Sequence, residues 1–353
     1  MQDPWVYEAI RKIEADFQRS ADTHLIKLDL PWLEHTPLYL KDESTHPTGS
    51  LKHRLARSLF LYGLCNGWIR EGTPIIESSS GSTAISEAYF ARLLGLPFIA
   101  VIPETTASRK IRQIEFYGGK CHLVSGPKIY EESHRLAAEL KGHYMDQFTF
   151  AERATDWRGN NNIAESIFRQ MEQEEFPIPA CIVMSAGTGG TSATIGRYLR
   201  YQRLSTQLTV VDPNNSVFKG YFETGDSSLT SAKGSCIEGI GRPRVEPSFI
   251  RTVIDEMRHV PDVASIATIR WLEKILGRRC GASTGTNVFG ALEVAHRMQQ
   301  QGLKGSIVTL ICDSGERYPD TYYDDVWVQQ HIGDIAPVLT RLDEFEQTGE
   351  WRL

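Results

Sequence analysis

Short apolar runs, many of them β-branched, recur along the chain and are typical of buried strands. Polar and glycine-containing segments separate the runs, so each is bounded as a strand would be. The predicted strands are 38–40, 74–77, 98–102, 121–124, 181–184, 208–211 and 306–312.

Helical periodicity fills the segments between several of these runs. Leu51, Leu55 and Leu59 recur at a spacing of four residues, as do Ile85, Tyr89 and Leu93, so each set lies on one face of a helix. Strands that alternate with helices predict an α/β fold with a largely parallel sheet. The segment 150–162, rich in charge, Asn and Trp, is the best candidate for a crossing between domains.

Composition excludes several classes of protein. The 353 residues include 38 basic and 44 acidic side chains, a net charge of −6, which argues against a nucleic-acid binder with a broad basic surface. The charged N-terminal twenty residues do not resemble a signal peptide, and the longest apolar stretch, 93–102, is too short to span a membrane. We therefore expect a cytoplasmic protein with two domains. Its six cysteines, without a C-x-x-C pair, are expected to be reduced core thiols.

Lys52 stands at the start of a predicted helix, in the segment Pro-Thr-Gly-Ser-Leu-Lys. With Ser50 as the expected N-cap, Lys52 falls in the first helical turn, where the positive end of the helix dipole lowers the pKa of an amine. A neutral amine is suited to Schiff-base chemistry. A lone lysine at a helix start is more often a solvated side chain, so this segment alone decides nothing.

A glycine-rich loop, Gly187-Thr188-Gly189-Gly190-Thr191, follows the strand at 181–184 and precedes a helix. Backbone N–H groups in such a loop surround an anion, and the helix dipole favours its negative charge. The loop matches neither the dinucleotide fingerprint nor the P-loop, because Ser192 replaces the third glycine and the lysine is absent. It predicts a phosphate site, and a turn without ligand is the alternative.

Two further loops leave predicted strands. Ser79, Ser80, Gly81, Ser82 and Thr83 open a helix and form a second small anion site, of a size to hold a substrate carboxylate. Ser314, after the strand at 306–312, presents a hydroxyl that is able to hydrogen-bond a heterocyclic nitrogen. Serine-rich turns also serve as plain helix caps, and that alternative stays open.

Two competing motifs carry less weight. Gly281-Ala282-Ser283-Thr284-Gly285 matches the nucleophile elbow of α/β-hydrolases, but that motif follows a strand, and residues 271–276 read as a helix that ends at Gly277. The histidines lack metal-ligand spacing and no H-E-x-x-H occurs, so we expect no metal site.

In combination, these segments resemble the cysteine synthase family of pyridoxal-phosphate enzymes, fold type II. Further segments recur in the family's order, so that the resemblance covers about residues 34–320: 102–105, 147–148, 237–241, 281–285 and 314–318. The resemblance implies a tryptophan synthase beta-like fold of two three-layer α/β/α domains with the active site between them. A smaller mobile domain, 44–152, would carry Lys52, and 1–43 plus 153–353 would form the larger domain.

The resemblance also implies the roles of the site residues. Lys52 would form the Schiff base with pyridoxal 5'-phosphate and move the Cα proton of the substrate. The cofactor phosphate would lie in 187–191, Ser314 would bond the pyridine nitrogen, and Ser82 would contact the cofactor. Substrate carboxylate binding would fall to Ser79, Ser80, Gly81, Thr83 and Gln147.

Departures from the family pattern bear on the reaction. Ser82 replaces the usual Asn and His53 replaces an acidic residue, while 22–25 and 239–247 look like the L-cysteine desulfhydrase branch, with Arg242 or Arg244 placed to close over the site. The resemblance therefore implies α,β-elimination of L-cysteine to hydrogen sulfide, pyruvate and ammonia, in a homodimer acting on a small amino acid. The alternatives are a cysteine synthase, which replaces the β-substituent of O-acetylserine, and a non-catalytic sensor that binds the cofactor.

Overall fold

The chain folds as two compact units, and the computed structural model describes residues 3–19, 22–159 and 162–352. Unit 1 comprises the chain up to Asp22 together with His46–Thr155, and unit 2 comprises Thr23–Thr45 together with the chain from Asp156 onwards. The boundary after Thr155 lies within the segment 150–162 that the sequence suggested as a crossing. Residues 160 and 161 of that segment lie outside the described residues.

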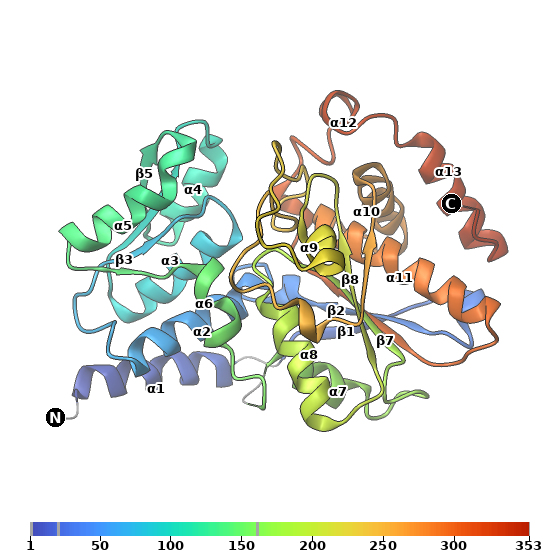
Figure 1. Cartoon of the computed structure of the whole chain (residues 1–353), viewed down its shortest axis with the longest axis horizontal. Helices are drawn as coiled ribbons and strands as arrows, with labels where there is room; N and C mark the ends of the chain where they lie inside the picture. Colours follow the sequence, from blue (N-terminus) through green and yellow to red (C-terminus); the bar gives the residue numbers. More distant parts are fainter. Residues whose placement is uncertain (1–2, 20–21, 160–161, 353) are drawn as a thin grey trace. The chain divides into compact units, whose positions relative to one another are not determined.

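Unit 1 is built on a four-stranded sheet in the order β5-β4-β3-β6, with every neighbouring pair parallel. Six helices accompany it along the chain (Figure 1). The strands are β3 (Ile75–Glu77), β4 (Phe98–Pro103), β5 (Lys120–Val124) and β6 (His143–Tyr144). The helices are α1 (Pro4–Gln18), α2 (Lys52–Cys65), α3 (Ser82–Leu94), α4 (Ser108–Phe116), α5 (Ile129–Glu139) and α6 (Gln147–Ala154).

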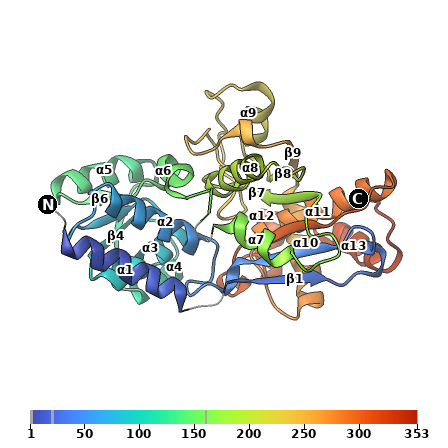
Figure 2. The same ribbon diagram turned by 90° about the horizontal axis from the view of Figure 1, so that it is seen from below.

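The two faces of this sheet bury different side chains, as strand geometry requires. Ile75 and Ala100 face a core made with α1, α2, α3 and α4, whereas Ile76 and Val101 face Leu136 of α5. Figure 2 shows α5 on the side of the sheet opposite to α1–α4. Unit 1 therefore has three layers, with its sheet in the middle.

Helix α1 belongs to unit 1, whereas the sequence led us to expect residues 1–43 in the larger domain. Asp3 caps the helix by accepting a hydrogen bond from the Trp5 N–H at 3.0 Å. Ala9 and Ile13 are buried in the core of unit 1. The Arg57 guanidinium of α2 donates to a carboxylate oxygen of Glu14 at 2.8 Å. These contacts account for the placement of α1.

Unit 2 is built on a six-stranded sheet in the order β1-β2-β10-β7-β8-β9. The pair β1–β2 is antiparallel and every other pair is parallel. The strands are β1 (His24–Leu28), β2 (Leu38–Asp42), β7 (Cys181–Ser185), β8 (Gln207–Asp212), β9 (Glu256–His259) and β10 (Ile307–Ile311). The helices are α7 (Ile163–Met171), α8 (Gly190–Gln202), α9 (Phe218–Thr224), α10 (Asp262–Leu276), α11 (Ala282–Gln300), α12 (Asp325–His331) and α13 (Ala336–Thr348).

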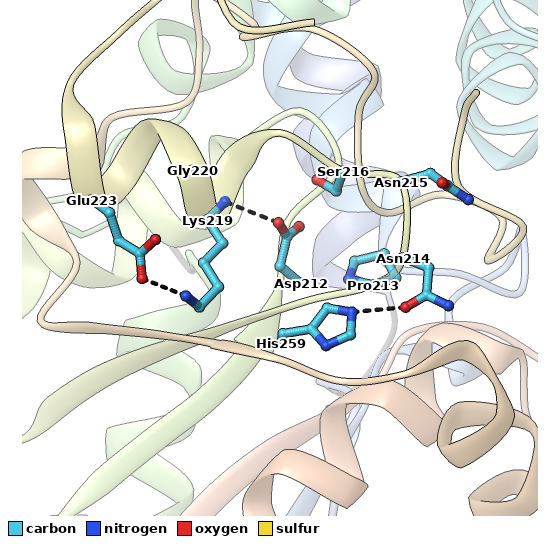
Figure 3. Close-up of a pocket in the computed structure, with 9 residues that line it drawn as sticks. All are labelled: Asp212, Pro213, Asn214, Asn215, Ser216, Lys219, Gly220, Glu223 and His259. Carbon is cyan, nitrogen blue, oxygen red and sulfur yellow. Dashed lines mark hydrogen bonds and ion pairs between the residues drawn. The ribbon is translucent and has the colours of Figure 1, made fainter. Parts of the chain in front are cut away.

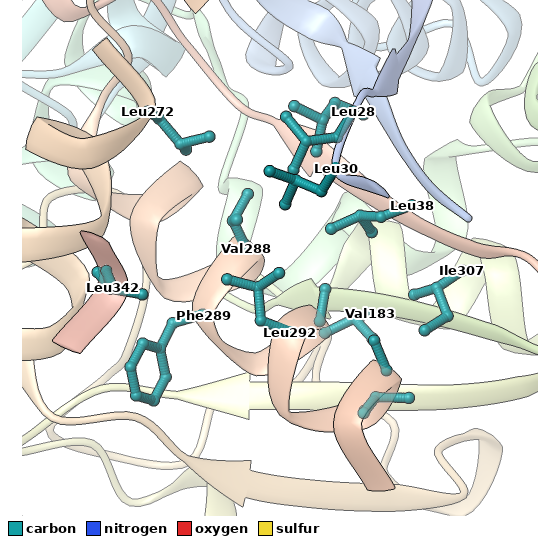
Figure 4. Packing of buried hydrophobic residues seen from close by; sticks show 14 of the residues in the cluster. Leu28, Leu30, Leu38, Val183, Leu272, Val288, Phe289, Leu292, Ile307 and Leu342 are labelled. Carbon is teal, nitrogen blue, oxygen red and sulfur yellow. The ribbon is translucent and has the colours of Figure 1, made fainter. Parts of the chain in front are cut away.

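The largest apolar core of unit 2 lies between this sheet and the helices α10, α11 and α13 (Figure 4). Val183 and Ile307 from central strands meet Leu292 of α11 in this core. The indole N–H of Trp271 donates to Glu346 of α13 at 2.7 Å. The C-terminal segment, for which the sequence suggested no role, thus covers the outer side of α10.

The sequence pattern predicted seven of the strands and missed three. Each predicted run contains or overlaps one of β2, β3, β4, β5, β7, β8 and β10. The prediction for the cysteines was partly wrong, because Cys65 and Cys236 are exposed, although all six are free thiols. In the part of the chain that the structure describes, no helix is long and apolar enough to cross a membrane.

Candidate active site

Lys52 is the first residue of α2, in the first helical turn as predicted. The chain enters the helix through a tight turn in which Gly49 has φ +72° and donates its N–H to the His46 carbonyl at 2.7 Å. The expected N-cap was wrong: Leu51 occupies that position, and no side chain caps the helix. Ser50 instead turns inward, where its hydroxyl is buried and has no hydrogen-bond partner among the residues that the structure describes.

A buried polar network fixes the turn that carries Lys52. Thr48 Oγ1 lies 3.1 Å from His53 Nδ1 and 2.9 Å from the hydroxyl of Ser86 in α3. The His53 ring also stacks on His46, with ring centroids 5.1 Å apart. Helix α2 therefore begins from a turn that is hydrogen-bonded to a second helix, which restricts the backbone on either side of Lys52.

The serine-rich turn connects β3 to α3. Gly81 N–H donates to Ser79 Oγ at 3.2 Å, and the helix begins at Ser82 without a side-chain cap. The first N–H groups of a helix have no acceptor within the helix itself. This end of α3 therefore presents backbone donors, with Ser80 half-buried beside them.

Gln147 lies against the same turn, as the sequence led us to expect. Thr83 Oγ1 donates to the Gln147 side-chain oxygen at 2.8 Å, and both residues are buried. Asp146, just before α6, has φ +45°, which is rare for a residue with a side chain and costs about 1 kcal/mol or more. Strained backbone held in this way often marks a functional position.

Two buried carboxyls beside this turn were missed by the sequence analysis. Glu77 is the last residue of β3 and Glu87 lies in α3, and neither is exposed to solvent. Glu77 Oε1 accepts from the Ser78 N–H at 2.7 Å, and Oε2 accepts from the Gln147 N–H at 3.2 Å. The available signal was an acidic residue close to Ala84, Ile85 and Ala88 in the sequence of a predicted helix.

The glycine-rich loop runs from β7 into α8 in unit 2. A methyl group on Gly187 would lie 2.0 Å from the Gly239 carbonyl oxygen, and one on Gly189, where φ is +86°, would lie 2.6 Å from the Ser248 carbonyl oxygen. These positions therefore require glycine. The segment containing Gly239 is fixed against the loop because Gly241 N–H donates to the Ala186 carbonyl at 2.8 Å.

The donors of this loop fit a phosphate group. Gly190 and Thr191 open α8, so their N–H groups lie at the positive end of a helix of 13 residues. Thr188 Oγ1 accepts from the Gly190 N–H at 3.2 Å, which shapes the loop from within. The Ser185 hydroxyl, at the end of β7, is buried without a partner. Among the described residues, no group of His, Cys, Asp and Glu side chains is arranged to hold a metal ion.

Ser314 lies beyond the end of β10, in the same unit as the loop. Its Oγ accepts from the Glu316 N–H at 3.3 Å, and its backbone pairs with Cys280. The serine motif at 281–285 is not a nucleophile elbow, because Ala282 begins α11 and Ser283 is buried. A methyl group on Gly285 would lie 1.9 Å from the Ser265 carbonyl oxygen of α10, so this glycine is needed for helix packing.

A separate polar pocket lies at the ends of β8 and β9 (Figure 3). The Lys219 N–H donates to Asp212 Oδ2 at 2.9 Å, and His259 Nε2 lies 2.7 Å from Asn214 Oδ1. Burial raises the pKa of Asp212 to about 6. No residue that the sequence predicted for the site lines this pocket.

Comparison with known families identifies the class of enzyme. Residues 18–313 match the family described as pyridoxal-phosphate dependent enzymes, which is most of the chain. The chain belongs to this family. Its cofactor is therefore pyridoxal phosphate, and the glycine-rich loop of unit 2 has the donors that the phosphate of this cofactor needs.

Relatives narrow the class further. The chain is 59% identical over 352 residues to the L-cysteine desulfhydrase Cds1 of Mycobacterium tuberculosis, covering 98% of this chain and 96% of the relative. A probable cysteine synthase of Bacillus subtilis is 29% identical, covering 87% of this chain and 95% of the relative. The crystal structure of an O-ureido-L-serine synthase matches with a TM-score of 0.75 and 27% identity, over 90% of this chain and 95% of that one. The fold is type II, in the cysteine synthase family.

Proposed function

We propose that this protein is an L-cysteine desulfhydrase, a carbon–sulfur lyase that converts L-cysteine and water to hydrogen sulfide, pyruvate and ammonia. The observation that carries the proposal is the 59% identity, over nearly the whole of both chains, to a protein of that activity. Bound pyridoxal phosphate withdraws electrons from the substrate and so makes its Cα–H bond acidic. The residues of this chain bind and orient the two molecules and move the proton.

Lys52 is proposed as the residue that attaches the cofactor through its amine and then takes the Cα proton of the substrate. The network of Thr48, His53 and Ser86 fixes the turn that precedes it. A base on a rigid backbone is held in one orientation relative to the proton that it removes, which speeds the transfer. A base on a flexible segment has to find that orientation first. This support explains why a catalytic lysine is placed at a helix start rather than on a mobile loop.

Unit 2 is proposed to bind the cofactor at two groups, the phosphate and the pyridine nitrogen. The N–H groups and hydroxyls of Gly187, Thr188, Gly189, Gly190 and Thr191 bind the phosphate, and Ser314 bonds the pyridine nitrogen. A serine hydroxyl donates a hydrogen bond to this nitrogen without protonating it, whereas an acid would protonate it. The unprotonated ring withdraws less electron density from the Cα of the substrate, which favours loss of the β-substituent over transamination.

The turn at the start of α3 is proposed to bind the substrate carboxylate. Ser79, Ser80, Gly81 and Thr83 supply hydroxyl and N–H donors, and Gln147 adds its side-chain amide, while Ser82 contacts the cofactor. The Gln147 oxygen already accepts from Thr83, so its NH₂ group is the end that remains to donate to an anion. We include in the proposal that unit 1 is the mobile unit.

A product assay tests the proposal. Purified protein loaded with pyridoxal phosphate and given L-cysteine is expected to release sulfide and pyruvate in a one-to-one ratio. A Lys52→Ala variant, which keeps the phosphate loop, is the matched control and is expected to release neither. Formation of cysteine from O-acetylserine and sulfide at a much higher rate than elimination would overturn the proposal.

The second candidate function is cysteine synthase, which a relative of 29% identity supports. Both reactions begin with the same proton removal from the amino acid, so assays with cysteine and with O-acetylserine have to be compared on one preparation. A sensor without activity is the third. Because a sensor that binds the cofactor through Lys52 is yellow as well, release of sulfide from cysteine argues against the sensor, and a yellow protein that releases no product supports it.

The proposal also includes a homodimer and a cytoplasmic location. The homodimer follows from the resemblance to the cysteine synthase family, and the location is the expectation drawn from the sequence. Size-exclusion chromatography with light scattering tests the dimer, and a molar mass of one chain would contradict it. Cell fractionation tests the location, and protein recovered mainly outside the cytoplasmic fraction would contradict it.

A further inference from the structure

Two carboxyls that interact with each other lie in the interior of unit 1. Glu77 and Glu87 are each fully buried, and among the described residues neither forms an ion pair. Burying one carboxylate without compensation is costly, and burying two against each other is more costly still. A proton has to reside in this pair at neutral pH.

Hydrogen bonds decide which carboxyl carries the proton. Glu77 accepts from the Ser78 N–H at 2.7 Å, from the Ser78 hydroxyl at 3.2 Å and from the Gln147 N–H at 3.2 Å, so its ionised form is well supplied with donors. Among the described residues, neither oxygen of Glu87 has a hydrogen-bond partner. Once protonated, Glu87 becomes a donor itself, and the Glu77 carboxylate is the neighbouring acceptor.

Charge and burial agree with this assignment. Burial, followed by the negative charge of Glu77 and by hydrogen bonding to it, raises the pKa of Glu87 well above its ordinary value. Burial also raises the pKa of Glu77, but the N–H groups of Gln147 and Ser78 act in the opposite direction. The pKa values of the two carboxyls thus differ because Glu77 accepts hydrogen bonds and Glu87 does not.

We propose that Glu87 donates a hydrogen bond to Glu77 and is the positioning residue for the carboxylate-binding turn. The two oxygens of Glu77 hold the first residue of that turn, Ser78, and the backbone of Gln147. The hydrogen bond from Glu87 fixes the carboxylate of Glu77. Glu77 then holds the backbone of Ser78 and Gln147 in the positions that substrate binding requires. This inference rests on the proposed function, because it takes the turn to bind the substrate carboxylate.

A buried acid at position 87 is not the choice that stability alone favours. Well-packed apolar side chains are as stabilising as buried ion pairs or more so, and Ala84, Phe90 and Ala91, three or four positions from Glu87 on α3, are buried and apolar. Glu87 instead supplies a directional hydrogen bond to Glu77, which holds the carboxylate-binding turn. That is why the expected effect of its loss lies in substrate binding more than in folding.

Three variants separate positioning from packing. Glu87→Gln keeps a donor toward Glu77, Glu87→Leu removes it at similar volume, and Leu94→Val perturbs a buried residue at the far end of the same helix. In the holoenzyme, Glu87→Leu is expected to raise the KM for L-cysteine at least tenfold, with kcat changed less than threefold. Glu87→Gln and Leu94→Val are expected to stay within threefold of the wild type in both.

A spectroscopic readout is independent of activity. Infrared spectra of the apoprotein at neutral pH are expected to contain the carbonyl band of a buried, protonated carboxylic acid, and Glu87→Gln is expected to lose it. This result holds whether or not the protein releases sulfide, so failure of the proposed function is distinguishable. If Glu87→Leu does not fold, the spectrum and the Glu87→Gln kinetics decide. Absence of the band, or an unchanged KM in a folded Glu87→Leu variant, would overturn the proposal.

Discussion

A methyl group added to Gly187 tests whether the loop of unit 2 is a fitted phosphate site. In Gly187→Ala the new carbon would lie 2.0 Å from the Gly239 carbonyl oxygen, whereas ordinary contact begins at 3.4 Å, so the two segments have to separate by about 1.4 Å. The obstacle is backbone, which lacks the rotamers that let a flexible side chain move aside. When the loop moves to relieve the contact, its own N–H groups shift.

The expected magnitude follows from the cost of overpacking. Inserting a carbon into a well-packed site costs about 1–3 kcal/mol. If the loop shifts away from the phosphate by the amount required, this cost appears in cofactor binding and raises the Kd for pyridoxal phosphate about 5- to 150-fold. The fold of unit 2 is expected to persist, because the loop lies outside β7 and outside most of α8.

The assay is a titration of apoprotein with pyridoxal phosphate, followed by the absorbance of the bound cofactor. Gly234→Ala is the matched control, because a methyl group there meets nothing within 4 Å and the backbone of Gly234 is not left-handed. Circular dichroism reports whether either variant is folded. A folded Gly187→Ala variant that binds pyridoxal phosphate as tightly as the wild type would refute the assignment of this loop.

Three further predictions address the other parts of the site. Gln147→Ala removes the acceptor of the buried Thr83 hydroxyl, and steady-state kinetics are expected to show a KM for cysteine raised by about tenfold; an unchanged KM would contradict the assignment. Glu246→Gln weakens the bonds from Arg242 and Arg244 to a buried carboxylate, so urea titration is expected to show a free energy of unfolding lower by about 2 kcal/mol, and an unaltered transition would show that these bonds contribute little. Because burial raises the pKa of both acids in the Glu77–Glu87 pair, the folded state holds protons that the unfolded state releases above its ordinary pKa of 4.5. The free energy of unfolding of the wild type is therefore expected to fall as pH rises from about 5 to 7, more steeply than that of Glu87→Gln by about 1.4 kcal/mol per pH unit, and parallel curves would contradict this.

Most of the strands that the sequence predicted are buried on both faces, and β5, with exposed positions at Lys120 and Leu123, is the exception. A run such as 307–311 is buried at every residue and contains no charged side chain. Two of the three missed strands differ: β1 has exposed positions at both His24 and Lys27, and β9 carries Glu256 and Arg258, which take part in ion pairs. β1 and β9 form the two edges of their sheet, where one side of the strand is free of the ladder and charge is tolerated.

The candidate site was predictable where the backbone of a loop requires glycine. Gly187 and Gly189 appear in the sequence because no other residue fits, and the structure gives the reason in the contacts that a side chain would make. The N-cap at Ser50 was wrong because the sequence does not reveal that this serine points into the interior. Glu87 was missed for the same kind of reason, since an acidic residue on a helix is usually solvated and only the fold shows its burial.

The central claim is that Lys52 attaches the cofactor whose phosphate the loop at 187–191 binds. Reduction of the holoprotein with borohydride, followed by proteolysis and mass spectrometry, locates the attachment directly. The expected result is a pyridoxyl group on the peptide that contains Lys52, reduced in amount in Gly187→Ala at limiting cofactor concentration. A pyridoxyl group on another lysine, with the Lys52 peptide unmodified, would contradict the account.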